Sequence, residues 1–156
     1  MKQAALLLFL AAAVAQKPPE QPVAYSHKRH IAAGLKCANC HEMRDPGEMM
    51  GIPEVSKCMT CHVCVKKDSL EIRKLAAFVR DGREVPWKRV YQIPSYVLFS
   101  HAAHLETGAK CETCHGPVAE RDRLWRETDI SMGGCMKCHQ QNRASNDCTF
   151  CHQPLN

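Results

Sequence analysis

One pentapeptide pattern, Cys-x-x-Cys-His, occurs five times in this chain of 156 residues and limits what the chain can fold into. In chain order the copies, called motifs 1 to 5 below, are Cys37-Cys40-His41, Cys58-Cys61-His62, Cys111-Cys114-His115, Cys135-Cys138-His139 and Cys148-Cys151-His152. A Cys-x-x-Cys pair alone also serves zinc binding and thiol redox chemistry. Neither use requires a histidine at the same offset in every copy. The repeated pattern therefore indicates covalent attachment of c-type heme.

The spacing within the motif follows from the chemistry of that attachment. The two thiols add to the vinyl groups of one heme, and two intervening residues let both sulfurs reach the same porphyrin edge. The next residue, histidine, is then turned onto the iron as its proximal ligand. We predict five covalently bound hemes c, attached through the ten cysteines of the motifs, with the proximal ligands His41, His62, His115, His139 and His152.

The eleventh cysteine, Cys64, follows motif 2 in the run Cys61-His62-Val63-Cys64. It completes a second Cys-x-x-Cys, but Val65 stands where the histidine would be. Three roles are open for it: a buried free thiol, a crosslink between two chains, or an iron ligand. The first is favoured because free cysteines are usually buried.

The four histidines outside the motifs are patterned as well. They form two pairs with spacing i, i+3, in the hexapeptides Tyr-Ser-His-Lys-Arg-His (25–30) and Phe-Ser-His-Ala-Ala-His (99–104). The first histidine of each pair lies ten residues before the first cysteine of a motif, and a shift of 74 residues superimposes the two segments as an internal duplication. We predict that all four are distal iron ligands: His27, His30, His101 and His104.

The rest of the composition leaves little material for an ordinary core. Apolar residues make up 45% of the chain, but this fraction includes the cysteines and an apolar N-terminus. A small chain that is poor in core residues needs another source of apolar bulk. Beyond the N-terminus, about 28 residues remain per motif, so we expect the porphyrins to form the core of a mostly irregular chain with short α-helices. Without heme, such a chain should be largely unfolded.

The segment between the two histidine pairs is expected to contain one short helix, over residues 68–80. Asp68 or Ser69 can cap its start, its apolar residues are Leu70, Leu75, Phe78 and Val79, and Gly82 ends it. Residues 85–99 contain two prolines and several β-branched or aromatic residues, which favour an extended chain with at most one short strand. We expect this segment to pack across both groups of hemes.

The N-terminus has the pattern of an export signal. A short basic start at Met1-Lys2 precedes an apolar run over 4–14 and the small residues of Ala13-Val14-Ala15. We predict a signal peptide over 1–15, cleavage before Gln16, a periplasmic or other extracytoplasmic location, and no membrane span in the mature chain. The formal charge of +5 comes from scattered basic residues that alternate with acids, which argues against nucleic-acid binding.

The Phe-Ser-His-x-x-His segment ahead of clustered motifs resembles the class III cytochromes c, in particular the small triheme cytochromes c7. Residues 99–156 show that family's plan of two histidines followed by three motifs, whereas the first half has only two motifs. The resemblance implies two tandem cytochrome c7-like modules, 16–64 with two hemes and 99–156 with three, joined by a linker over 65–98. It also implies four ligand pairs: His27 with His41, His30 with His62, His101 with His115, and His104 with His139.

The fifth heme then lacks a histidine partner for His152. In the triheme relatives the corresponding distal histidine lies a few residues before the middle motif, and here that stretch contains Met132. A thioether is an accepted heme ligand that raises the reduction potential, so Met132 is our candidate for the distal ligand. The alternatives are Met43, Met49, Met50, Lys66, Lys67, Cys64 or an open coordination position.

The run from Trp87 to motif 3, together with Met132-Gly133, also resembles the pentaheme cytochrome c subunits of quinol-oxidising complexes such as alternative complex III. This resemblance implies an electron carrier, not an enzyme, that exchanges electrons with redox partner proteins and with a membrane-bound quinol-oxidising complex. The alternative is a multiheme reductase of a small oxyanion or nitrogen oxide, which would need one open heme.

Overall fold

The computed structural model describes residues 17–153, so the expected signal peptide over 1–15 lies outside the described residues. Within that part the chain is mostly irregular, with short helices and no β-strand. Two isolated bridges, between Met43 and Met50 and between Val97 and His152, are the extended pairings recorded there. The expectation of short helices in a mostly irregular chain is confirmed.

Motifs 1, 3 and 5 each start a helix or 3₁₀ turn, and motifs 2 and 4 lie within a helix. The elements are α1 (His27–Ala32), the 3₁₀ turn η1 (Cys37–Asn39), α2 (Val55–His62), α3 (Leu70–Arg80), α4 (His101–Glu106), α5 (Cys111–His115), the 3₁₀ turn η2 (Val118–Glu120), α6 (Met132–Gln141) and α7 (Cys148–Cys151). Four of the helices begin after a serine whose hydroxyl accepts a backbone N–H from the first turn; these serines are Ser26, Ser69, Ser100 and Ser131. Local capping therefore sets where these helices start.

Helix α3 was predicted over 68–80, and the structure confirms it. The hydroxyl of Ser69 accepts the backbone N–H of Ile72, and Gly82 follows the helix with a φ of +61°. The helix packs against α2 and buries Ile72 and Leu75. Leu70, which the pattern placed among the apolar residues of the helix, is exposed in its first turn.

The apolar core is small and lies where α2 and α3 meet. Its buried members are Val23, Val55, Ile72, Leu75 and Val85. Partly buried residues pack around them: Cys58, Met59, Phe78 and Trp87. For the part of the chain that the structure describes, five buried side chains are far fewer than a domain of that size normally needs to fold alone. The rest of the described chain must be held by something other than an apolar core.

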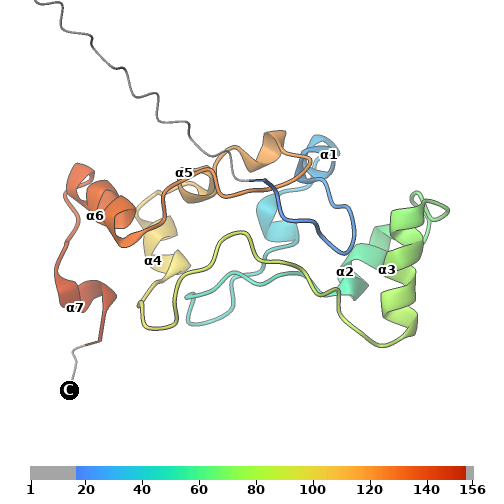
Figure 1. Ribbon diagram of the computed structural model, residues 1–156, viewed down its shortest axis with the longest axis horizontal. Coiled ribbons are helices and arrows are strands. Elements are labelled where there is room, and N and C mark those ends of the chain that lie inside the picture. Colours follow the sequence, from blue (N-terminus) through green and yellow to red (C-terminus); the bar gives the residue numbers. More distant parts are fainter. Residues whose placement is uncertain (1–16, 154–156) are drawn as a thin grey trace, which may run out of the picture.

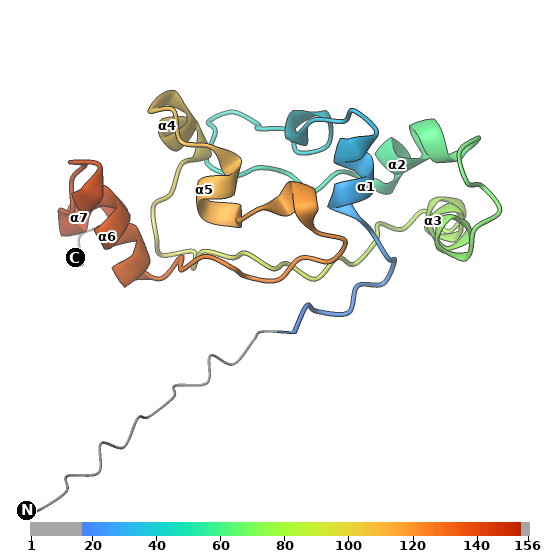
Figure 2. The same cartoon turned by 90° about the horizontal axis from the view of Figure 1, so that it is seen from above.

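The helices are spread along one long axis. In Figures 1 and 2, α2 and α3 lie at one end, α6 and α7 lie at the other, and α1, α4 and α5 lie between them. The segment after α3 runs along this axis to α4 without forming a strand. Within residues 17–153, no helix has the length and apolar character needed to cross a bilayer.

The small core predicts that the chain depends on heme for its fold. Produced without heme maturation, the chain should lose most of its helical signal and melt without a cooperative transition, because five buried side chains cannot offset the entropy of ordering it. Far-ultraviolet circular dichroism of the heme-free and heme-loaded forms measures this. A cooperative melt of the heme-free chain would contradict the prediction.

Candidate heme sites

The histidine rings lie in four close pairs. The centres of the paired rings are 6.3 Å apart for His27 and His41, 6.0 Å for His30 and His62, 6.4 Å for His101 and His115, and 6.1 Å for His104 and His139. An imidazole nitrogen lies about 2 Å from a transition metal that it binds, so two rings on opposite sides of one ion have centres roughly 6 Å apart. The structure thus brings together the pairs that the resemblance implied, at a spacing that fits one iron between each.

Backbone carbonyls hold most of these rings in one orientation. Nδ1 lies within hydrogen-bonding distance of a carbonyl oxygen in seven histidines: His30 with Ser26 at 2.7 Å, His104 with Ser100 at 2.7 Å, His41 with Gly51 at 2.7 Å, His62 with Val65 at 2.9 Å, His139 with Ser145 at 2.6 Å, His101 with Glu48 at 2.8 Å and His152 with Tyr96 at 3.4 Å. A carbonyl only accepts, so Nδ1 must carry the proton. The lone pair then lies on Nε2, the arrangement found in metal-binding histidines.

Sequence reasoning missed the residues that orient the distal histidines. The ring of Tyr25 stacks on His30 at 4.4 Å between centres and meets His27 edge-on at 4.8 Å. In the second copy, Phe99 makes the same two contacts, each at 4.8 Å, with His104 and His101. The serine that follows each aromatic residue caps the helix. The signal was present in the sequence, because an aromatic residue and a serine precede both histidine pairs.

Burial keeps two of the ligand candidates neutral. Burial, with further contributions from His41 and His30, lowers the pKa of His27 to about 4. Burial also lowers the pKa of His115, assisted by His101 and His41. A neutral imidazole is the form that binds a metal, so both rings are in the required state at pH 7.

His152 is the one motif histidine without a second imidazole. All nine histidines lie within the described residues, and the four pairs use the other eight. The aromatic ring near His152 belongs to Tyr96, with centres 6.2 Å apart, and the backbone of Val97 forms a bridge with His152. Met132, the predicted distal ligand, opens α6 and has 68% of its surface exposed, so its thioether is not packed into the protein.

Cys64 is exposed, which corrects the interpretation favoured from the sequence. Helix α2 ends at His62, and the turn that follows extends beyond the small core. Val63 and Val65 on either side of the cysteine are exposed as well. The buried environment that free cysteines usually have is therefore absent at this position.

Cysteines of different motifs are neighbours. Burial raises the pKa of Cys58, with a further contribution from Cys40. Burial likewise raises the pKa of Cys111, whose thiol also interacts with that of Cys37. Burial raises the pKa of Cys114, with a further contribution from Cys138. Burial also raises the pKa of Cys135, with further contributions from Cys114, Cys151 and Cys138. The attachment sites are thus close to one another and not isolated.

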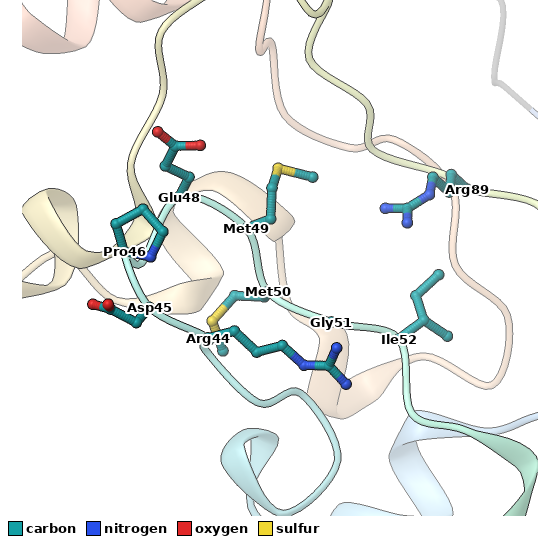
Figure 3. Close-up of a pocket in the computed structure, with 9 residues that line it drawn as sticks. All are labelled: Arg44, Asp45, Pro46, Glu48, Met49, Met50, Gly51, Ile52 and Arg89. Carbon is teal, nitrogen blue, oxygen red and sulfur yellow. The ribbon is translucent and has the colours of Figure 1, made fainter.

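The loop after motif 1 borders two open hollows. One, of about 380 Å³, is lined by residues 44–46, 48–52 and Arg89, and Figure 3 shows Arg44 and Arg89 approaching it from separate segments. The other, of about 300 Å³, is lined by Cys40 among others and therefore adjoins motif 1. The guanidinium groups of Arg44 and Arg89 suit carboxylates, such as the propionates of a heme.

Two family models match the chain, one in each half. The model described as class III cytochrome C family matches residues 10–84. The model described as cytochrome c7 and related cytochrome c matches residues 97–153.

The chain is also similar along most of its length to one curated protein, from Nitratidesulfovibrio vulgaris strain Hildenborough. That protein is named "Menaquinone reductase, multiheme cytochrome c subunit". The two are 34% identical over 163 aligned residues, which cover 86% of this chain and 77% of the relative.

The serine caps give a test of how α4 supports the candidate ligands. Ser100→Ala removes the hydrogen bond from Ala103 N–H, at 3.2 Å, and should lower the free energy of unfolding by about 1 kcal/mol. Because α4 carries His101 and His104, the variant should also shift the reduction potentials of the hemes at motifs 3 and 4. Chemical denaturation and potentiometric titration measure the two effects.

The matched control is Ser69→Ala, which removes the equivalent cap of α3. It should cost a similar free energy of unfolding and leave all potentials unchanged, because α3 carries no ligand candidate. Equal effects of the two variants on the potentials would contradict the role of α4.

Proposed function

Because this chain belongs to the class III and cytochrome c7 family of multiheme cytochromes c, whose members transfer electrons, we propose that it is a pentaheme electron carrier that works outside the cytoplasm. The observation that carries the proposal is the set of four histidine pairs with ring centres 6.0 to 6.4 Å apart. Each pair includes the histidine of a Cys-x-x-Cys-His motif. The fifth motif has the same attachment residues.

The residues of the chain would have two roles, attaching the heme and binding its iron. Heme supplies reversible one-electron chemistry. The ten motif cysteines would attach it covalently, and the paired histidines would bind the iron at motifs 1 to 4. An iron closed on both sides cannot bind a substrate, so these four sites suit electron transfer alone. The carbonyls at Nδ1 hold the rings in place between redox states.

We propose the domain plan expected from the sequence: a signal peptide over 1–15, a two-heme module over 16–64, a linker over 65–98 and a three-heme module over 99–156. The apolar run near the start supports export, because c-type heme is attached outside the cytoplasm in bacteria. Arg44 and Arg89 are proposed to hold heme propionates, since both line one hollow that is bordered by the loop after motif 1.

The similarity to the relative supports a quinone-linked role. That protein is named as a subunit of a menaquinone reductase. We propose that this chain likewise exchanges electrons between a soluble redox partner protein and a membrane-bound complex that reduces or oxidises a quinone. The direction of flow would be set by the potentials of the partners at its two ends.

A second candidate function rests on His152. Since no second imidazole faces it within the described residues, the iron at motif 5 takes either a ligand of another type or none. With Met132 as the ligand, motif 5 would be the site of highest potential and the protein a carrier throughout. With an open position, motif 5 could bind a small oxyanion or nitrogen oxide, and the protein would be a reductase.

Spectroscopy of one variant pair separates these functions. The oxidised wild-type protein should show the near-infrared sulfur-to-iron charge-transfer band, and the reduced protein should not bind carbon monoxide. In Met132→Leu the band should disappear and one heme should bind carbon monoxide, because the leucine has no donor atom. Met136→Leu, in the same helix, should behave as wild type. A wild-type protein that lacks the band and binds carbon monoxide would favour the reductase.

The number of hemes is checked by intact mass. The exported protein should begin at Gln16 and carry the mass of five hemes. A Cys148→Ala, Cys151→Ala variant should carry four, because only motif 5 is removed. A mass with fewer than five hemes in the wild-type protein would contradict the pentaheme assignment.

A further inference from the structure

Two equivalent hydrogen bonds join the two copies of the duplicated segment. In one direction, the N–H of Lys28 in α1 donates to the carbonyl of Arg121 at 3.1 Å. In the other, the N–H of Ala102 in α4 donates to the carbonyl of Gly47 at 2.9 Å. The shift of 74 residues that relates the copies converts one bond into the other. Each histidine helix therefore docks on the segment that follows the first motif of the opposite half.

Side chains reinforce both contacts. The hydroxyl of Ser26 donates to the carboxylate of Asp122 at 2.6 Å, and α1 packs against η2. On the other side, the hydroxyl of Ser100 lies 3.4 Å from the carbonyl of Gly47. A Cβ on Gly47 would lie only 2.5 Å from that of Ala102, so the close approach of loop and helix requires glycine there. Such a reciprocal contact has the form of a two-fold dimer interface within one chain.

This docking joins the sites of motifs 1 and 3. The short segment 48–51 supplies two of the orienting carbonyls: Gly51 to His41, at 2.7 Å, and Glu48 to His101, at 2.8 Å. The first histidine belongs to motif 1, and the second is paired with the histidine of motif 3.

Within each half, neighbouring sites share an aromatic residue. Tyr25 contacts the distal histidines of motifs 1 and 2, and Phe99 contacts those of motifs 3 and 4. Motif 5 adjoins motif 4, since the amide of Asn146, just before motif 5, donates to the carbonyl of Met136 in α6 at 3.1 Å. Figures 1 and 2 agree with this order, with α2 at one end of the long axis, α5 nearer the middle, and α6 with α7 at the other end.

We infer that the two halves dock as an internal two-fold pair, and that this docking places the five attachment sites in the spatial order 2, 1, 3, 4, 5. The inference rests on the proposed function, because it assigns a path to the hemes held there. Electrons cross between the halves at motifs 1 and 3, each hop oxidising one iron and reducing its neighbour. The sites of His62 and His152 are the two ends, where a donor protein and an acceptor supply and remove the electron.

A crystal structure of the heme-loaded protein, with the irons located by anomalous scattering, tests the order. The shortest iron-to-iron distance between the halves should join the irons bound by His41 and His115, and the irons of His62 and His152 should be terminal. A different pair at the crossing, or an internal iron at motif 2, would overturn the inference. Intact mass of the same sample counts the hemes, so a failure of the proposed function is seen separately.

A substitution in the interface gives a second test. Gly47→Ala forces a side chain at a φ of +88° against Ala102, which should displace Glu48 from His101. The electron paramagnetic resonance signal of the heme at motif 3, identified with His101→Met, should then shift although the substitution lies in the first half. An unchanged signal would overturn the docking.

The control is Gly82→Ala. Its φ is also positive, at +61°, but nothing lies within 4 Å of the added Cβ. It should lower stability through backbone strain and leave the signal of the motif 3 heme in place. A shift of equal size in the control would mean that general destabilisation, not the interface, moves the signal, and would also overturn the docking. If Gly47→Ala does not fold, the iron positions in the wild-type protein still decide the matter.

Discussion

Paired imidazoles, six of the eight held by a backbone carbonyl at Nδ1, are the constraint on which this molecule depends. Within residues 17–153, five side chains are buried in an apolar core, all near the junction of α2 and α3. In the rest of the chain, the fixed points are places where a histidine of a helix faces the histidine of a motif. A metal between two such rings joins segments far apart in the sequence, as a crosslink would, and restricts the unfolded chain accordingly. The geometry of the histidine pairs thus fixes the chain where side-chain packing does not.

The same constraint explains why the loops matter more than the helices. The helices are one to three turns long, and they are stable only where they are capped and docked. The carbonyls that orient the rings come largely from irregular segments, such as 48–51 and Ser145. These segments could not be shortened or straightened without turning a candidate ligand, so the irregular chain is part of the candidate sites.

Much of this architecture could be predicted from the sequence because it is local. The cap of Ser69 and the spacing of the apolar residues are contained in one segment, and α3 has the bounds that they indicate. The pairing of the histidines came from the resemblance, and the structure brings those rings together. In contrast, the contact of Glu48 with His101 depends on the docking of the two halves, which no local pattern records. The exposure of Cys64 depends on how far its turn extends beyond a core that the sequence alone does not locate.

The core of α2 and α3 has a further consequence. A shift of 77 residues, which superimposes motif 4 on motif 2, places motif 5 on residues 71–75, within α3. An apolar helix with Leu75 and Phe78 therefore stands in the first half where the second half carries its last attachment site. The two halves therefore differ at their ends: the first half ends in a helix that buries aliphatic side chains, and the second half ends in a Cys-x-x-Cys-His motif. Two identical ends would offer the same surface to every partner protein, whereas this difference in construction gives the molecule two distinct ends.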